Sequence, residues 1–387
     1  MTSETLFETE AEAGLAETER LAWLRLIRTE NVGPVTFADL LRRFGTASAA
    51  LDALPRLARR GGRARDLRIC PVADAEHELE ATVRAGARML CLPDPDYPEA
   101  LRAIDSPPPV ICVRGDTEVL NRPAVAMVGA RNASANGRRF ARDMAAALGT
   151  HGFTVVSGLA RGIDTAAHEG GLDTGTAAVL AGGIGHVYPA ENEALFSRIA
   201  KDGCLVSEMP AGFVPQARHF PRRNRLVSGL ALGVLVVEAA QRSGSLITAR
   251  CALEQGREVF AVPGSPLDPR ARGSNGLIRQ GAMLVQEPGD ILDALAAALH
   301  RPFRERAPAA AELFALPDPA EAEADSAGEE DARAALFDLL GPSPVAQDEL
   351  VRQSGLPAAT VAAIMLEWEL AGRVSRQPGQ LVARLDS

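Results

Sequence analysis

The feature that most constrains the fold is a regular alternation of apolar runs with helical segments over residues 123–295. Six of these runs read AVAMVGA, FTVVSG, TAAVLAGG, LVSE, ALGVLVVEA and EVFAVPG. They are apolar on both faces, as is typical of parallel strands that helices cover on both sides. The repeated order of strand and helix predicts an α/β fold with a Rossmann-like, doubly wound, mostly parallel sheet.

The 387 residues provide for two or three domains, and we place the Rossmann-like domain at 86–300. Residues 1–85 are predicted to form a small helical domain. The turn Val32-Gly33-Pro34 joins two amphipathic helices, which is typical of a SAM-like or helix-hairpin-helix (HhH) pair. Such a hairpin can offer backbone N–H groups to a phosphate. Because only one hairpin is visible, we favour a helix pair that packs and binds nothing.

The C-terminal part changes character twice. Residues 301–331 are rich in acids and poor in large apolar groups, so we expect a flexible acidic linker. Residues 332–387 are predicted to form a winged-helix domain. Its expected recognition helix, 357–371, has no lysine or arginine and carries Glu367 and Glu369. Since phosphates dominate affinity for DNA, we predict that this tail contacts protein, or nothing, rather than a specific duplex.

Composition excludes several classes of protein. The net charge is −9, yet residues 110–290 hold more basic than acidic groups. Five cysteines lack CxxC spacing, so we expect reduced thiols and neither a zinc site nor a disulfide framework. No apolar run could span a membrane, and the acidic start lacks a signal pattern, so a cytoplasmic location is expected. Without a P-loop, a GxSxG elbow or a metal-ligand set, we expect no catalysis, no metal and no cofactor.

Five polar loops at the strand ends carry the functional signal. They read VGARNAS (128–134), SGLARGIDTAAH (157–168), HFPRRNRLVSG (219–229), QRSGSLIT (241–248) and a pair of segments, PGS and RARGSNG (263–276). Glycines, hydroxyls and arginines suit phosphate binding, and the carboxyl ends of parallel strands meet at one edge. Five such loops therefore predict a long site for a polyanion.

Individual residues in these loops permit narrower expectations. Arg131 replaces a glycine of the dinucleotide fingerprint, so its guanidinium would contact phosphate and crowd a dinucleotide. Asp164 is expected to cap a helix N-terminus, and His168 to be a packed residue rather than a base. Three arginines are expected just before a helix, where the adjacent Phe220 suits base stacking in single strands.

Eight strings in one order carry a resemblance to a known family. They are VGARNAS, SGLARGIDTAAHEGGL, TAAVLAGGIGHVYPAEN, GCLVSEMP, HFPRRNRLVSGL, RSGSLITA, VPGSP and GSNGLIRQGA. The chain resembles the DNA-processing protein A (DprA/Smf) family closely over about 110–290. The resemblance implies a homodimer without enzymatic activity that binds and protects single-stranded DNA during natural transformation, and that loads the recombinase RecA.

The resemblance also implies a set of DNA-binding residues. Carried over position by position, they are Gly129, Arg131, Ser134, Arg161, Arg222, Arg223, Asn224, Arg225, Ser243, Gly244, Ser245 and Asn275. Where the family often has lysine among its contacts, this chain has arginine, which keeps the charge and changes the geometry.

Two other interpretations stay open. The sheet and its glycine-rich edge also resemble nucleotide phosphoribohydrolases, which would use the same pocket. Those enzymes carry a PGGxGTxxE-like element, whereas the corresponding loop here, RSGSLITA, lacks the acid. The third interpretation is an interaction scaffold whose arginines are solvated.

Overall fold

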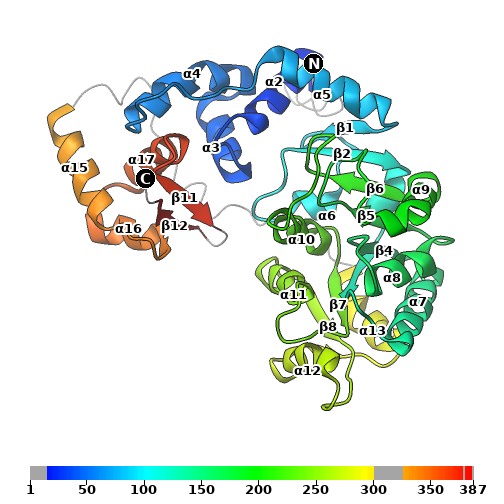
Figure 1. The fold of residues 1–387 in the computed structure, drawn as a ribbon. Helices are drawn as coiled ribbons and strands as arrows, with labels where there is room; N and C mark the ends of the chain where they lie inside the picture. Colours follow the sequence, from blue (N-terminus) through cyan, green and yellow to red (C-terminus); the bar gives the residue numbers. More distant parts are fainter. Residues whose placement is uncertain (1–14, 300–325, 378–379, 386–387) are drawn as a thin grey trace, which may run out of the picture. The chain divides into compact units, whose positions relative to one another are not determined.

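The computed structural model describes residues 15–299, 326–377 and 380–385. The chain divides into two compact units (Figure 1). One combines the N-terminal part, up to Glu76, with the C-terminal winged helix. The other begins at His77 and contains a large sheet. Within the described ranges, no helix has both the length and the apolar character needed to cross a membrane.

The sheet has nine strands in the order β1-β2-β6-β5-β4-β3-β7-β8-β9. The seven strands from β6 to β9 pair in parallel, while β1 pairs antiparallel with β2 and β2 antiparallel with β6. The predicted mostly parallel, Rossmann-like sheet is confirmed. The strands are β1 Arg88–Cys91, β2 Val110–Gly115, β3 Ala124–Gly129, β4 Thr154–Ser157, β5 Thr176–Val179, β6 Cys204–Ser207, β7 Gly233–Val237, β8 Glu258–Ala261 and β9 Met283–Leu284.

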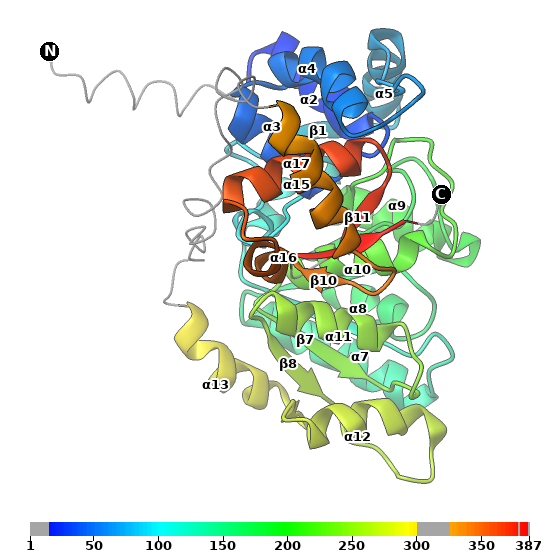
Figure 2. The same ribbon diagram turned by 90° about the vertical axis from the view of Figure 1, so that its left-hand side faces the viewer.

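Helices cover both faces of the central strands, as predicted from runs that are apolar on both faces. Alternate residues of a strand point to opposite faces. Val125 and Met127 of β3 therefore pack in one core cluster, while Ala126 and Val128 pack in another. The first cluster contains residues of α7, α8 and α13, and the second contains residues of α10 and α11 (Figure 1). Figure 2 views the sheet from the side of α10 and α11.

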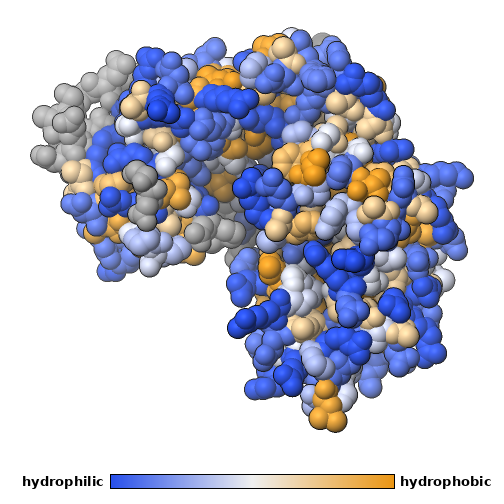
Figure 3. All heavy atoms as spheres, in the orientation of Figure 1, coloured by the Kyte–Doolittle hydropathy of each residue, from blue (hydrophilic) through white to orange (hydrophobic). Residues whose placement is uncertain are grey.

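These helices alternate with the strands along the chain. Their bounds are α5 Val72–Arg84, α6 Glu99–Arg102, α7 Ala135–Thr150, α8 Ile163–Gly171, α9 Glu193–Asp202, α10 His219–Gly229, α11 Ser245–Glu254, α12 Arg272–Arg279 and α13 Pro288–Leu299, with 3-10 turns η1 Thr117–Leu120, η2 Ala190–Asn192 and η3 Pro269–Ala271. The visible surface over this domain is largely hydrophilic, with hydrophobic side chains in small groups (Figure 3).

The N-terminal domain contains the expected helix pair, α2 and α3, and a third helix, α4, that packs on them. Their bounds are α2 Glu17–Arg28, α3 Pro34–Phe44 and α4 Ala47–Arg60. Pro34 occupies the first turn of α3, where its missing N–H costs nothing. Trp23 and Phe37 meet edge to face, with ring centroids 4.9 Å apart. Although we expected this domain to reach residue 85, the compact unit changes within α5, between Glu76 and His77.

The C-terminal elements give the predicted helices and hairpin of a winged helix. They are α15 Ser326–Asp338, β10 Val345–Ala346, α16 Gln347–Ser354, α17 Ala358–Leu370, β11 Val374–Gln377 and β12 Leu381–Arg384, with the strand order β10-β12-β11. The acidic linker predicted for 301–331 falls mostly outside the described residues. Helix α15 begins at Ser326, inside the predicted linker, because acidic composition alone does not prevent a helix.

Helix α17, the expected recognition helix, is packed against α3 and α4 of its own chain. The Glu367 side chain is 1% exposed and pairs with Arg60, at 3.3 Å, and with Arg333. The Arg376 guanidinium bonds to Asp39 and lies 3.3 Å from Glu369. Part of this helix is therefore engaged within its own chain. That the tail contacts protein, or nothing, rather than a specific duplex stays a prediction.

Candidate nucleic-acid interface

The candidate site lies where the strand order reverses, between β3 and β7. The chain runs outward from β3 through β4 and β5 to β6, then returns to place β7 on the other side of β3. In open α/β sheets, ligands bind at the carboxyl ends of the strands beside such a switch point. The loops after β3, β4 and β7 all open onto this edge.

Glycines bring the loops after β3 and β4 into direct backbone contact. Gly162 has a φ of +82°, and a Cβ there would lie 2.2 Å from the Ala130 carbonyl oxygen. A Cβ on Gly129 would lie 1.9 Å from the Val237 carbonyl oxygen on β7. The Ile163 N–H donates to the Ala130 carbonyl at 3.2 Å. The loops after β3 and β4 are therefore in direct contact beside the end of β7.

An exposed arginine stacks on an aromatic pair at this edge. The Arg131 guanidinium carbon lies 5.2 Å from the centre of the Phe220 ring, within the range of a cation–π contact. The Phe220 ring centre is 5.4 Å from that of Tyr188, which follows β5. Tyr188 is 46% exposed. We call Arg131, Phe220 and Tyr188 the stacking cluster. Sequence reasoning did not predict Tyr188 as a site residue. Its only local signal is its position before Pro189, in the loop after β5.

Arg223 differs from its neighbours because it is buried. The segment with the arginines was expected just before a helix, but α10 begins at His219 and includes it. Arg223 is 7% exposed, and its Nη1 donates to the Gly158 carbonyl at 2.6 Å and to the Val179 carbonyl. Burial lowers the pKa of Arg223 to about 10, so the guanidinium remains charged at neutral pH. It joins α10 to β4 and β5.

Asp164 secures the loop after β4 instead of capping a helix, which corrects our expectation. The N-cap of α8 is Gly162, and the Asp164 carboxylate accepts N–H bonds from Gly158 at 3.2 Å and Ala160 at 3.3 Å. The chain turns back at Gly162, so the carboxylate faces the loop. Burial raises the pKa of Asp164, and the nearby charge of Arg223 opposes that shift.

His168 is a packed residue, as predicted. It is fully buried, and its Nδ1 lies 2.7 Å from the Thr176 hydroxyl. Burial lowers the pKa of His168 to about 3, so its ring is neutral at physiological pH.

Buried Glu208 anchors two of the other predicted arginines. Arg225 donates to its carboxylate at 2.7 Å and to the Ser106 carbonyl at 2.7 Å. Arg222 approaches the same carboxylate at 3.5 Å, and its side chain stays 49% exposed. The Arg222 guanidinium therefore remains accessible to a ligand, while the Arg225 guanidinium is mostly bonded within the protein.

The remaining predicted residues mainly hold loops together. The Asn224 amide donates to the Gly244 carbonyl at 3.3 Å, which ties α10 to the loop after β7. The Ser243 and Ser245 hydroxyls are 2.7 Å apart, just before α11. Asn275 both donates to and accepts from the backbone of Gly264, at 2.8 and 3.1 Å.

Arg161 is exposed and lies 3.5 Å from Glu191, an exposed surface pair of little energetic weight. Ser134 is the N-cap of α7, and its hydroxyl is bonded to Glu238, which sequence reasoning did not single out. Of the predicted set, Arg131, Arg161 and Arg222 thus present exposed guanidinium groups at the edge.

The cysteines and potential metal ligands give no second site in the described part of the chain. Cys70, Cys91, Cys112 and Cys204 are buried, Cys251 is half-buried, and all five are free thiols as expected. Among the described residues, no group of three or more histidines, cysteines or acids is placed to hold a metal ion.

The fold and the edge define a class of protein. It has a Rossmann-like sheet with exposed arginines at its carboxyl edge, a helical N-terminal domain and a winged helix. Family models agree with each part: a DNA recombination-mediator protein A model matches 88–296, a DprA-like N-terminal HHH domain matches 17–81, and a DprA winged helix domain matches 318–380. The chain belongs to the DNA-processing protein A (DprA/Smf) family.

Individual relatives support this assignment over most of the chain. Protein Smf of Escherichia coli is 42% identical over 292 residues, which is 74% of either chain. Protein Smf of Synechocystis is 32% identical and covers 96% of this chain and 100% of its own. The solved structure of DNA processing protein A from Streptococcus pneumoniae matches 76% of this chain and 98% of its own, with 32% identity and a TM-score of 0.55.

A second similar structure is that of DNA processing protein A from Helicobacter pylori, a protein described as having a unique single-stranded DNA binding mode. It covers 55% of this chain and 96% of its own, with 28% identity and a TM-score of 0.51.

Proposed function

We propose that the carboxyl edge of the sheet binds single-stranded DNA. The observation that carries this proposal is the stacking cluster, in which an exposed arginine and two aromatic rings lie in contact at the switch point. Sequence-tolerant binding of single strands combines stacking of bases on aromatic rings with arginines along the backbone. The exposed guanidinium groups of Arg161 and Arg222 extend the positive surface beyond the cluster.

The geometry favours an unpaired strand over a duplex. Rings such as Phe220 and Tyr188 can stack only on bases whose faces are accessible, and those of a duplex are already stacked. The single-stranded DNA binding described for the H. pylori relative supports the same choice. Sequence preference should be weak, because each base presents a similar face.

Arg223, Arg225 and Asn275 take a supporting role in this proposal. Their side chains bond to carbonyl groups within the domain, so they fix the loops that carry the exposed groups. The proposed direct contacts are Arg131, Arg161 and Arg222, with Ser243 and Gly244 allowing close approach of the strand. Gly129 instead allows β3 to lie close to the Val237 carbonyl of β7.

The proposed biological role follows from the family. The chain would protect incoming single strands during natural transformation and load RecA onto them, without catalysis. A homodimer would join two edges and gain avidity without new contacts. Light scattering tests the dimer, and a pull-down with purified RecA, with and without an oligonucleotide, tests the recombinase contact.

Titration of a labelled dT oligonucleotide by fluorescence anisotropy tests the binding, with unlabelled duplex as competitor at two salt concentrations. We expect preference for the single strand and an affinity that falls as salt rises. Equal competition by duplex would contradict the proposal. Release of free base or ribose phosphate from mononucleotides would support the phosphoribohydrolase interpretation instead.

A further inference from the structure

The helix N-terminus beside the switch point already holds an anionic group. In doubly wound sheets, the helix that follows the first strand binds phosphate through its N-terminal N–H groups. Here that helix is α7, and the Glu238 carboxylate occupies the position. Its Oε2 accepts the Ser134 backbone N–H at 2.8 Å, and the Ser134 hydroxyl donates to Oε1. The Ser134 hydroxyl oxygen accepts the Gly137 N–H at 2.9 Å.

The backbone is bent to bring this carboxylate into place. Glu238 directly follows β7 and has a φ of +54°, in the left-handed region that residues with a Cβ rarely adopt. Such a conformation persists only where surrounding contacts hold it. The two bonds to Ser134 are contacts of this kind.

Gly137 keeps the space that the carboxylate fills, and Gly129 keeps the backbone beside it close. A Cβ on Gly137 would lie 2.6 Å from the Glu238 carboxyl carbon and 2.7 Å from its Oε1. A Cβ on Gly129 would collide with the carbonyl oxygen of Val237, the residue before Glu238. The start of α7 is thus shaped around the Glu238 side chain, and the close packing of β3 on β7 fixes the backbone that carries it.

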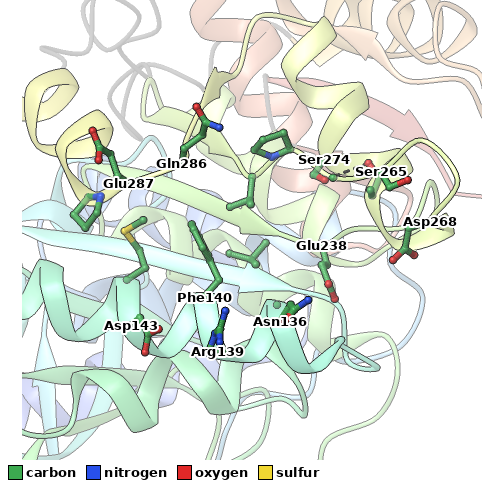
Figure 4. A pocket seen from close by; sticks show the side chains of 18 of the residues that line it. Asn136, Arg139, Phe140, Asp143, Glu238, Ser265, Asp268, Ser274, Gln286 and Glu287 are labelled. Atoms are coloured by element: carbon green, nitrogen blue, oxygen red, sulfur yellow. Dashed lines mark hydrogen bonds between the residues drawn. The ribbon is translucent and has the colours of Figure 1, made fainter.

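The neighbouring cavity adds further negative charge. It has a volume of about 610 Å³, and its lining includes Glu238, Asp143, Asp268, Glu287 and Arg139. Figure 4 shows Glu238 beside Asn136, at the start of α7, with Asp268 on the loop after β8. A free phosphate in this cavity would face more carboxylates than guanidinium groups, even though Asp268 is paired with Arg270 at 2.9 Å.

We propose that Glu238 is a specificity-determining residue that keeps inorganic phosphate and mononucleotide phosphates out of the switch point. Where it concerns DNA, this inference rests on the proposed function: a polymer can still bind through the stacking cluster and the exposed arginines. A mononucleotide has few of those contacts and would depend on the start of α7, where Glu238 already accepts the Ser134 N–H and hydroxyl. The exclusion of phosphate itself does not depend on DNA binding.

The test compares phosphate binding by the full chain and two variants, Glu238→Gly and Glu238→Asn. Glycine and asparagine both tolerate a positive φ, so both variants should fold, which far-UV circular dichroism checks. Isothermal titration calorimetry with inorganic phosphate, and separately with thymidine 5′-monophosphate, gives the affinity. Glu191→Asn is the matched control, because it removes an exposed acid near the same edge without opening the start of α7.

Both Glu238 variants should bind phosphate about tenfold or more tightly than the wild type, which corresponds to at least one charge-assisted hydrogen bond. Glu191→Asn should match the wild type. The proposal is overturned if neither Glu238 variant gains affinity, or if the control gains as much. A wild type that fails to bind dT would refute the proposed function, while the phosphate titrations would still decide the role of Glu238.

Discussion

Replacement by alanine of two adjacent arginines, Arg222 and Arg223, should change stability by very different amounts. Arg223 is buried and donates to the carbonyls of Gly158 and Val179. Arg223→Ala would leave these carbonyls short of a donor and the buried Asp164 without its nearby positive charge. Leaving a buried carbonyl without its donor costs about 1–3 kcal/mol for each group, so the two losses should lower the stability of the sheet by roughly 2–6 kcal/mol. Arg222→Ala, at a half-exposed side chain, should change stability by only about 0.5 kcal/mol.

The positions of the tryptophans allow a loss of stability to be assigned to one of the two compact units. Its two tryptophans, Trp23 and Trp368, both lie in the unit without the large sheet. Tryptophan fluorescence therefore follows unfolding of that unit, and hydrogen exchange of β4 and β5 follows the sheet. Arg223→Ala should speed exchange in these strands and leave the fluorescence transition unchanged, while Arg222→Ala alters neither. Equal stability of the sheet in the two variants would refute the structural role of Arg223.

Three further predictions concern other parts of the fold. Arg376→Ala removes the buried partner of Glu369 and one of two arginines paired with Asp39, the other being Arg42. The free energy of unfolding from tryptophan fluorescence in urea should therefore fall by about 3–5 kcal/mol, and an unchanged midpoint would contradict the packing of α17. The folded pKa of His168 is about 3, below its unfolded value near 6.5. The stability of the sheet should therefore fall by about 2 kcal/mol from pH 6.5 to 5. Urea titrations of His168→Gln should show no such dependence on pH. The raised pKa of Asp164 acts in the opposite direction, because the folded state keeps this proton at a pH where the unfolded state has lost it. Gly162→Ala places a Cβ against the Ala130 carbonyl at a positive φ, whereas Gly152 has a similar φ and open space around it. In thermal unfolding, Gly162→Ala should therefore destabilise the protein more than Gly152→Ala. Equal losses of stability would count against the contact between the loops after β3 and β4.

The sequence was sufficient to predict the sheet and the edge at which the polar loops meet. Runs such as GVLVV and AVAMVG are apolar at every position, which is the pattern of a strand buried on both faces. The glycine-rich loops after them could be placed at one edge because parallel strands end on the same side. Pairing of β1 and β2 as an antiparallel extension was not predicted, since short strands carry no signal of their partners.

The burial of Arg223 could have been predicted from helical spacing. Once α10 begins at His219, Arg223 lies on the same face as Leu226 and Val227, three and four positions later, and both of those are buried. Expecting the helix to start after the arginines hid this relation. An arginine cluster was therefore taken as one surface, although its members divide between the interior and the edge.

Tertiary contacts set the remaining parts of the site, and local sequence could not predict them. Tyr188 meets Phe220 only because the loop after β5 and the start of α10 lie together in the fold. The contact of Glu238 with Ser134 depends on the pairing of β7 with β3. The docking of α17 on the N-terminal helices joins residues from opposite ends of the chain. None of these contacts has a fixed spacing in sequence.

The most direct test of the central claim is the affinity of Arg131→Ala for a labelled dT oligonucleotide, measured by anisotropy beside Arg122→Ala. Arg122 is exposed and precedes the same strand, β3, so it lies at the opposite, amino end of the sheet. Loss of a charge-assisted contact by Arg131→Ala should weaken binding by about 1.5–3 kcal/mol, or roughly 10- to 150-fold. Arg122→Ala should bind like the wild type. Unchanged affinity of Arg131→Ala, or an equal loss in both variants, would contradict a single-strand site at the carboxyl edge.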